Sequence, residues 1–231
     1  MPNDQTSDLG AFEGLSPEEV RTILSGTSTV RLAPGDPLFL QGDPADRFFL
    51  LKQGWLKVTQ VTADGQKLIV RIVHPGEFFG FAPALQRDEY PGSCEAIVDS
   101  VALVWPRNRW KAVLGAAPSV TLSIVQAIGR KLDEAHVRLR EMTTEEAARR
   151  VANLLLRLWS EAGESAIDTG GGIELPYPLT RQDIADMSGN TLHTVSRIMA
   201  AWETQGVLGR GRRKVVIADL DALKQLAGFD D

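Results

Sequence analysis

The spacing of glycine and proline changes near residue 107, and this change divides the chain into two differently built halves. Between about residues 28 and 106, short apolar runs alternate with turn sequences, a pattern typical of an all-β sandwich or roll. We expect strands at residues 67–73 and 96–105, because both runs are rich in β-branched and apolar side chains. The turn sequences are Pro34-Gly35-Asp36, Gln41-Gly42-Asp43, Gln53-Gly54, Ala63-Asp64-Gly65, His74-Pro75-Gly76 and Tyr90-Pro91-Gly92, of which Asp64-Gly65 is the strongest hairpin signal.

Helical patterns lie on both sides of this region. Residues 9–26 predict a short helix, in which Ser16 is a suitable N-cap because proline and two acidic residues follow it. Beyond the β-patterned region glycine becomes rare, and Pro118 can begin a long helix that reaches Glu141. A second helix is expected over residues 144–161.

One side of the predicted long helix is apolar. Ile128, Leu132, Ala135 and Leu139 are separated by 4, 3 and 4 residues, which keeps one seam facing a partner helix. The same residues could instead pack on their own domain, since the seam is only about two heptads long. We expect a homodimer, with contacts from Ile124, Ile128, Leu132, Ala135 and Leu139.

Cysteine content excludes two kinds of site. Cys94 is the only cysteine, so neither an intrachain disulfide nor an iron–sulfur cluster held by about four thiolates can form within one chain. No run approaches the roughly 18 apolar residues of a membrane span, and the polar, acidic N-terminus does not resemble a secretory signal. We therefore expect a cytoplasmic protein with no membrane partner.

Residues 179–203 have the pattern of a helix-turn-helix. Thr180 is expected to cap the first helix together with Asp183, and Gly189 supplies the turn. The second helix is expected to begin near Thr191 and to present its N-terminal half to base edges, as a recognition helix does. Its expected inner face is Val195, Ile198, Met199 and Trp202, and the DNA-facing candidates are Thr180, Arg181, Thr191, His193, Thr194, Ser196 and Arg197.

A basic turn follows this motif. Two short apolar runs flank residues 209–214, which predicts a wing. The chain has a net charge of −5, which taken whole argues against nucleic-acid binding. Between His193 and Lys214, however, there are five basic residues and only one acidic residue, Glu203. This excess gives the local positive charge that phosphate binding requires. The alternative is that these arginines only solubilise a hairpin. The expected phosphate contacts are Arg210, Arg212, Arg213 and Lys214.

These motifs together resemble the Crp/Fnr family of bacterial transcription regulators. The resemblance covers nearly all of the chain and is most specific in Leu179-Thr180-Arg181-Gln182-Asp183-Ile184-Ala185 and Thr194-Val195-Ser196-Arg197-Ile198. It implies an α+β protein with a cyclic-nucleotide-binding-like jelly roll (the β-roll) over residues 9–117. A dimerisation helix over 118–143 and a winged helix-turn-helix over 144–231 would follow. The β-roll part of the resemblance lies in Pro34-Gly35-Asp36, Gln41-Gly42-Asp43, Gly54 and Gly76-Glu77-Phe78-Phe79-Gly80.

The resemblance also implies an effector pocket, at which this chain departs from the cyclic-nucleotide-binding members. They carry a ribose-binding glutamate where this chain has Phe81, and a phosphate-binding arginine where it has Gly92. Ser93 is retained, and Arg87 lies nearby but would need a loop shift to take part. We therefore expect no response to cyclic AMP. The expected pocket residues are Phe79, Gly80, Phe81, Gly92 and Ser93.

The sequence from Asn190 to Arg197 resembles the nitric-oxide-responsive, NnrR-type branch, whose members lack iron–sulfur cysteines. Some relatives are thought to use haem, for which His74 and Cys94 are the candidate axial ligands within the β-roll. The resemblance thus implies control of denitrification genes by nitric oxide or low oxygen. It leaves open an organic effector, such as a nucleotide or another metabolite, in the same pocket.

A cupin-like metal enzyme is a third alternative, but it needs two or three histidines and a carboxylate, and the β-patterned region offers only His74. For the regulator, we expect Arg197 to contact guanine in an inverted repeat resembling TTG and CAA. Family members usually carry glutamate where this chain has His193, so the preference at that base should change. RNA polymerase is the further partner that the resemblance implies.

Overall fold

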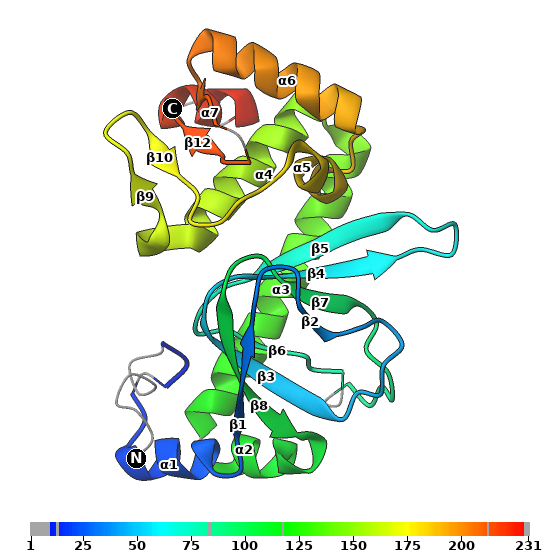
Figure 1. The fold of residues 1–231 in the computed structure, drawn as a ribbon, viewed down its shortest axis with the longest axis vertical. Helices are drawn as coiled ribbons and strands as arrows, with labels where there is room; N and C mark the ends of the chain where they lie inside the picture. Colours follow the sequence, from blue (N-terminus) through cyan, green and yellow to red (C-terminus); the bar gives the residue numbers. More distant parts are fainter. Residues whose placement is uncertain (1–9, 13, 83–84, 117, 212, 229–231) are drawn as a thin grey trace. The chain divides into compact units, whose positions relative to one another are not determined.

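A computed structural model describes residues 10–12, 14–82, 85–116, 118–211 and 213–228 of the chain. The chain divides into two units, one of residues 1–66 and 70–134 and one of residues 67–69 and 135–231. Their helices and strands are labelled in Figure 1.

The first unit contains two four-stranded antiparallel sheets, with strand orders β1-β8-β3-β6 and β2-β7-β4-β5. Strand β8 lies between β1 and β3, and its register pairs Leu103 with Thr29 on one side and with Leu50 on the other. Glycine has a positive φ angle at five of the six turns that the sequence marked, for example 82° at Gly65 between β4 and β5. The strands are β1 (Ser28–Leu32), β2 (Pro37–Phe39), β3 (Arg47–Gln53), β4 (Leu56–Val61), β5 (Lys67–Val73), β6 (Phe78–Phe79), β7 (Ser93–Ala96) and β8 (Ser100–Pro106).

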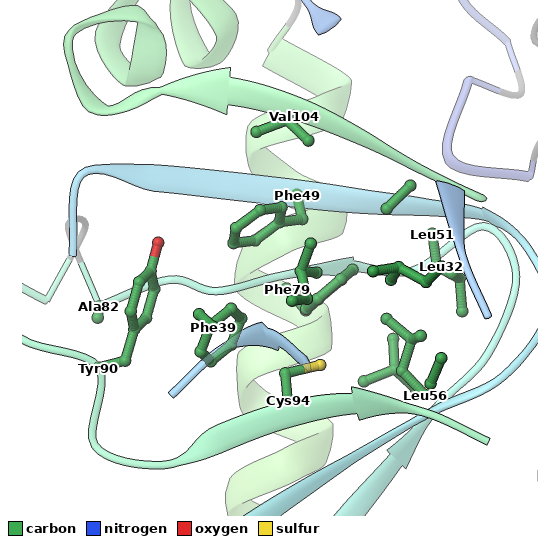
Figure 2. Packing of buried hydrophobic residues seen from close by; sticks show 14 of the residues in the cluster. Leu32, Phe39, Phe49, Leu51, Leu56, Phe79, Ala82, Tyr90, Cys94 and Val104 are labelled. Atoms are coloured by element: carbon green, nitrogen blue, oxygen red, sulfur yellow. The ribbon is translucent and has the colours of Figure 1, made fainter. Parts of the chain in front are cut away.

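Aromatic rings fill the space between these sheets. Phe39 stacks on Tyr90 with a ring-centroid distance of 4.0 Å, and Phe49 stacks on Phe79 at 5.2 Å. Figure 2 shows these rings with Cys94 in one buried cluster. The Tyr90 hydroxyl donates to the Arg47 carbonyl at 2.6 Å, so its polar atom is satisfied.

A second buried cluster joins the outer side of β3 and β8 to helices. It receives side chains from α1 (Pro17–Leu24), α2 (Trp110–Ala116) and the first part of α3 (Pro118–Thr144). The Trp105 indole donates to the Ile23 carbonyl at 2.7 Å and ties β8 to α1. Ile124 of α3 is 4% exposed within this cluster.

Two sequence predictions in this unit need correction. The run over residues 96–105 is two strands, β7 and β8, because Val98 and Asp99 form a turn between them. The helix expected over residues 9–26 is a 3-10 turn, Gly10–Phe12, followed by α1. The predicted cap of α1 is confirmed, since the Ser16 side chain accepts from the Glu19 amide in a capping box. The strand at 67–73 is also confirmed.

The second unit contains the end of α3, a helix-turn-helix and a small antiparallel sheet of order β11-β12-β10-β9. The helix expected from residue 144 begins at Ala147, because Glu146 is extended and acts as its N-cap. These elements are α4 (Ala147–Ala162), β9 (Ile167–Asp168), β10 (Ile173–Glu174), α5 (Arg181–Ser188), α6 (Leu192–Gln205), β11 (Leu208–Gly209), β12 (Val216–Ile217) and α7 (Leu220–Ala227), with a 3-10 turn at Gly163–Ser165.

The predicted fold class is confirmed: a β-roll is followed by a long helix and a winged helix-turn-helix. The long helix begins at Pro118, as expected. The three predicted domain ranges stay a prediction.

Candidate DNA-binding surface and effector cavity

Side-chain caps fix where the two helices of the helix-turn-helix begin. The Thr180 hydroxyl accepts from the Asp183 amide at 3.0 Å, and the Asp183 carboxylate accepts from the Thr180 amide at 2.8 Å. The Thr191 hydroxyl accepts from the Thr194 amide at 3.2 Å and caps α6. The predicted cap at Thr180 and the predicted start of the second helix near Thr191 are therefore confirmed, and the turn residue Gly189 has a left-handed φ of 65°.

Arg150 of α4 holds this turn in place and was not among the residues predicted from the sequence. Its guanidinium donates to the Ser188 carbonyl at 3.2 Å and to the Asn190 side-chain oxygen at 2.7 Å, on either side of Gly189. It also donates to the Glu145 carbonyl at the end of α3, at 2.6 Å. One half-buried arginine thus links the turn of the DNA-binding motif to the α3–α4 junction. No sequence signal marks it, because its partners lie up to 40 residues away.

Helix α6 has the buried and exposed faces that a recognition helix needs. Val195, Met199 and Trp202 are buried, whereas His193 and Arg197 are exposed, and the predicted inner residue Ile198 is only half-buried. Among the described residues, no carboxylate pairs with Arg197. Leu192, at the first position of the helix, is 45% exposed; it was not among the predicted contacts.

Some predicted DNA-facing cations already have protein partners. Arg181 lies 2.9 Å from a Glu203 carboxylate oxygen, and Lys214 lies 2.7 Å from one of Glu174. Arg181 also donates to the Ser196 carbonyl at 3.4 Å, so it braces α5 against α6. Arg210 and Arg213 are exposed and unpaired within the described residues, and Arg212 lies outside them.

A cavity of about 350 Å³ opens in the β-roll next to α3. Its wall is mostly apolar and includes the rings of Phe39, Phe79, Phe81 and Tyr90. The Phe81 ring is held from behind by Trp110, with centroids 5.7 Å apart in an edge contact. Such a volume is at the lower end for small-molecule sites, so this cavity suits a small ligand.

Charged side chains line one part of the same cavity. Glu77 is almost fully buried and pairs with Arg71, so these two charges neutralise each other. Lys131 of α3 lines the cavity and pairs with Glu134 at 3.1 Å. Arg87 also lines the cavity and needs no loop shift to do so, which corrects the sequence analysis.

Four of the five predicted pocket residues line this cavity: Phe79, Gly80, Phe81 and Gly92. Ser93 is not among its described lining residues, and its hydroxyl accepts from the Gln41 amide at 2.9 Å. Side chains alternate along β7, and Cys94 takes the inward position, so Ser93 faces the other way. A Cβ at Gly92 would lie 2.6 Å from the Thr59 carbonyl oxygen, so no larger side chain fits there without a shift of the backbone.

Neither haem-ligand candidate of the sequence analysis is among the described residues that line the cavity. Cys94 is fully buried among apolar side chains (Figure 2), and burial raises the pKa of its thiol to about 12. His74 lies 3.4 Å from a Glu77 carboxylate oxygen. The two residues therefore do not fit as axial ligands in this cavity.

Helix α3 carries a stripe of exposed apolar side chains, here called the α3 stripe. Its large members are 40–64% exposed. Val125, Leu132 and Leu139 are seven residues apart, and Ala135 is also exposed. Ile124, expected in this seam, instead packs into its own unit's core against residues of α1 and α2, whereas Ile128, one turn further along, is 40% exposed. The large members are Leu122, Val125, Ile128, Leu132, Leu139 and Met142.

Two family models match this architecture. The cyclic nucleotide-binding domain matches residues 29–116, and the Crp-like helix-turn-helix domain matches residues 149–226, together more than two thirds of the chain. The chain belongs to the Crp/Fnr family. It is 29% identical over 216 residues to the cyclic AMP receptor protein of Thermus thermophilus, covering 94% of this chain and 95% of the relative.

Further members agree with this assignment. The anaerobic regulatory protein of Pasteurella multocida is 26% identical over 194 residues, covering 83% of this chain and 68% of the relative. A crystal structure of a CRP/FNR-family transcriptional regulator from Thermus thermophilus matches with a TM-score of 0.71 and 28% identity, covering 87% and 98% of the two chains. As a Crp/Fnr member the chain is a DNA-binding transcription regulator and not an enzyme, which sets the cupin-like alternative aside. No helix in the described part of the chain is long and apolar enough to cross a membrane.

Proposed function

We propose that this Crp/Fnr-type regulator binds an inverted-repeat promoter site as a homodimer, and that an effector in the β-roll cavity sets its affinity for DNA. The observation that carries the DNA part is the exposed N-terminal half of α6, where Arg197 has no carboxylate partner among the described residues. A forked guanidinium in that position can donate to both O6 and N7 of a guanine.

The α3 stripe supports the homodimer. Apolar residues that repeat every seven positions pack well against an equivalent helix, and a row of exposed large apolar side chains marks an interaction surface. Two such helices related by a two-fold axis would place two recognition helices about one helical turn of DNA (~34 Å) apart.

The expected half-site resembles TTG, with CAA as its inverted partner. Arg197 would read the guanine, and exposed His193 would alter the preference at the base that glutamate reads in relatives. Arg210, Arg213 and the wing residues around them would hold phosphates, which carry no sequence information. RNA polymerase is the proposed protein partner at the promoter, in the cytoplasm.

Besides an organic effector bound in the cavity, nitric oxide or low oxygen is a second candidate signal. The NnrR-like sequence from Asn190 to Arg197 supports it, as does similarity to a relative named as an anaerobic regulatory protein. A haem held by His74 or Cys94 is not part of this proposal, since neither residue is among those that line the cavity. The cavity itself favours an organic effector.

The proposed effector is not cyclic AMP. Phe81 and Gly92 lack the carboxylate and guanidinium that hold ribose and cyclic phosphate in relatives, and the space at Gly92 is closed by the Thr59 carbonyl. Calorimetric titration should therefore detect no micromolar binding of cyclic AMP.

Selection of bound DNA from a random pool tests the proposed function. The full-length protein should recover an inverted repeat with guanine at a fixed position in each half. The selection is repeated with nitric oxide, with haem and with cyclic AMP. Recovery of single half-sites, or of no common sequence, would contradict the homodimeric regulator.

A further inference from the structure

The rings around the β-roll cavity form a fixed apolar slot. Phe39 and Tyr90 are stacked with centroids 4.0 Å apart, and the Tyr90 hydroxyl is anchored on the Arg47 carbonyl. Phe81 is braced by Trp110 from the second core cluster. Because these rings are held by buried neighbours, a flat apolar ligand meets a preformed surface and orders few side chains on binding.

The charge left over at this cavity is positive. The Arg71–Glu77 pair is internally neutral, and Lys131 shares its charge with Glu134. Arg87 is exposed, lines the cavity and has no carboxylate partner among the described residues. A ligand with an anionic group would therefore gain a charge-assisted contact with Arg87 and Lys131, whereas a cation would be repelled.

The cavity offers little to a ligand rich in hydroxyl groups. Glu77, the one buried carboxylate among its described lining residues, is already engaged by Arg71 and by the His74 amide, which donates to it at 3.4 Å. The Gln60 amide group donates to the Pro91 carbonyl at 3.1 Å and is likewise engaged. A buried sugar would leave its donors unsatisfied, at a cost in affinity for each of them.

We propose that the cavity binds a small aromatic carboxylate, with its ring against Phe39, Phe79 and Phe81 and its carboxylate on Arg87. This inference rests on the proposed function, in which the β-roll cavity holds the effector. It goes further by naming the chemical class: one aromatic ring and one negative charge.

Isothermal titration calorimetry of the full-length protein tests this class with four probes: phenylacetate, indole-3-acetate, phenylacetamide and cyclic AMP. At least one of the two acids should bind with a micromolar to low-millimolar dissociation constant. Phenylacetamide has the shape of phenylacetate without its charge. It should bind at least about tenfold more weakly than phenylacetate, or undetectably if indole-3-acetate is the acid that binds, because it loses a charge-assisted hydrogen bond.

Two matched arginine variants locate the charge. Arg87→Gln should weaken the binding acid at least about tenfold, because it removes the guanidinium but keeps a long polar side chain. Arg31→Gln removes an exposed arginine of β1 outside the cavity and should leave the affinity unchanged. Circular dichroism melting of both variants establishes that each one is folded.

The proposal is overturned if neither acid binds at about 10 mM, if phenylacetamide matches or exceeds the acid, or if cyclic AMP binds more tightly. It is also overturned if Arg87→Gln has no effect or if both arginine variants weaken the acid equally. A gel shift on the pool-selected DNA separates this result from the proposed function. If the wild-type protein does not bind DNA, the proposed function as a DNA-binding regulator is wrong. If it binds DNA but neither acid, only the proposed ligand class is wrong.

Discussion

The helix-turn-helix and the β-roll cavity use their charged side chains in different ways. On the recognition surface, Arg197 and Arg210 are exposed and unpaired within the described residues, ready for phosphates and base edges. In the cavity, Arg71 and Lys131 are paired with carboxylates, only Arg87 has no carboxylate partner among the described residues, and most of the wall is apolar. The first arrangement fits the DNA-binding activity of the family. The cavity differs from the cyclic-nucleotide pattern at Phe81 and Gly92, so its own lining residues, and not the family pattern, indicate the ligand.

The largest expected effect concerns the α3 stripe, on which both regions depend if the protein is a dimer. Leu132→Glu would place a carboxylate on each chain in the proposed seam, at a cost of several kcal/mol if the charges stay buried. We expect sedimentation to show monomers and the gel shift to lose its cooperative complex.

The control for this variant is Asp133→Lys, which changes the charge of an exposed neighbour on the same helix. It should sediment as the wild type does. A Leu132→Glu protein with an unchanged dimer mass would show that the α3 stripe is not the interface.

The next effect lies within the DNA-binding unit. Arg150→Ala removes the donor to the Ser188 and Glu145 carbonyls and to the Asn190 side-chain oxygen, although the Ser188 carbonyl keeps a hydrogen bond from the Asn190 amide group. We expect a loss of about 3 kcal/mol in the free energy of unfolding of this unit, measured by urea denaturation. DNA affinity should fall for all sequences alike, because the turn at Gly189 loosens without a change in the base contacts.

Arg149→Ala is the matched control, since Arg149 is the exposed neighbour of Arg150 on α4. Its unfolding free energy should stay within about 0.5 kcal/mol of the wild-type value. Equal losses for the two variants would mean that the contacts of Arg150 add nothing beyond its place in the helix.

The same two regions differ in how far the sequence could predict them. The cap at Thr180, the start of α6 near Thr191 and the turn at Gly189 were predicted, because each depends on partners within a few residues. Arg150 was missed, because its contact with Asn190 spans 40 residues. Interactions between neighbouring residues therefore predict where the helices of a helix-turn-helix begin and end, but not the long-range contacts that hold the motif together.

The cavity was predicted only where the family resemblance supplied positions. Phe81 and Gly92 were found in this way, whereas Arg71 and Lys131 were not, since strands and helix far apart in sequence bring them together. Periodicity also failed to separate the buried positions of α3 from the exposed ones. Ile124 and Ile128 are one turn apart, and only packing reveals that the first is buried in the core while the second is 40% exposed.

A smaller effect should distinguish base contacts from phosphate contacts on the recognition surface. Arg197→Ala should cost roughly 1–3 kcal/mol on the selected site and flatten the preference for guanine. Arg210→Ala should weaken all sequences alike and reduce the slope of affinity against salt by about one. Repeating the pool selection with each variant measures both. An unchanged guanine preference for Arg197→Ala would show that α6 is not the recognition helix.

The smallest effect should come from restoring the family's ligand-binding residues. The double variant Phe81→Glu with Gly92→Arg returns the glutamate and arginine of the cyclic-nucleotide pattern, yet we expect no gain in cyclic AMP affinity by calorimetry. The reason is steric: a Cβ at position 92 lies 2.6 Å from the Thr59 carbonyl oxygen, so β4 and the loop before β7 must separate. Overpacking of this kind costs about 1–3 kcal/mol, which should appear as a lower melting temperature.

Gly92→Ala alone meets the same carbonyl and should lower the melting temperature too, which separates the steric cause from the added charge. Micromolar cyclic AMP binding by the double variant would mean that the loop adapts freely and that only two side chains separate this cavity from a nucleotide site.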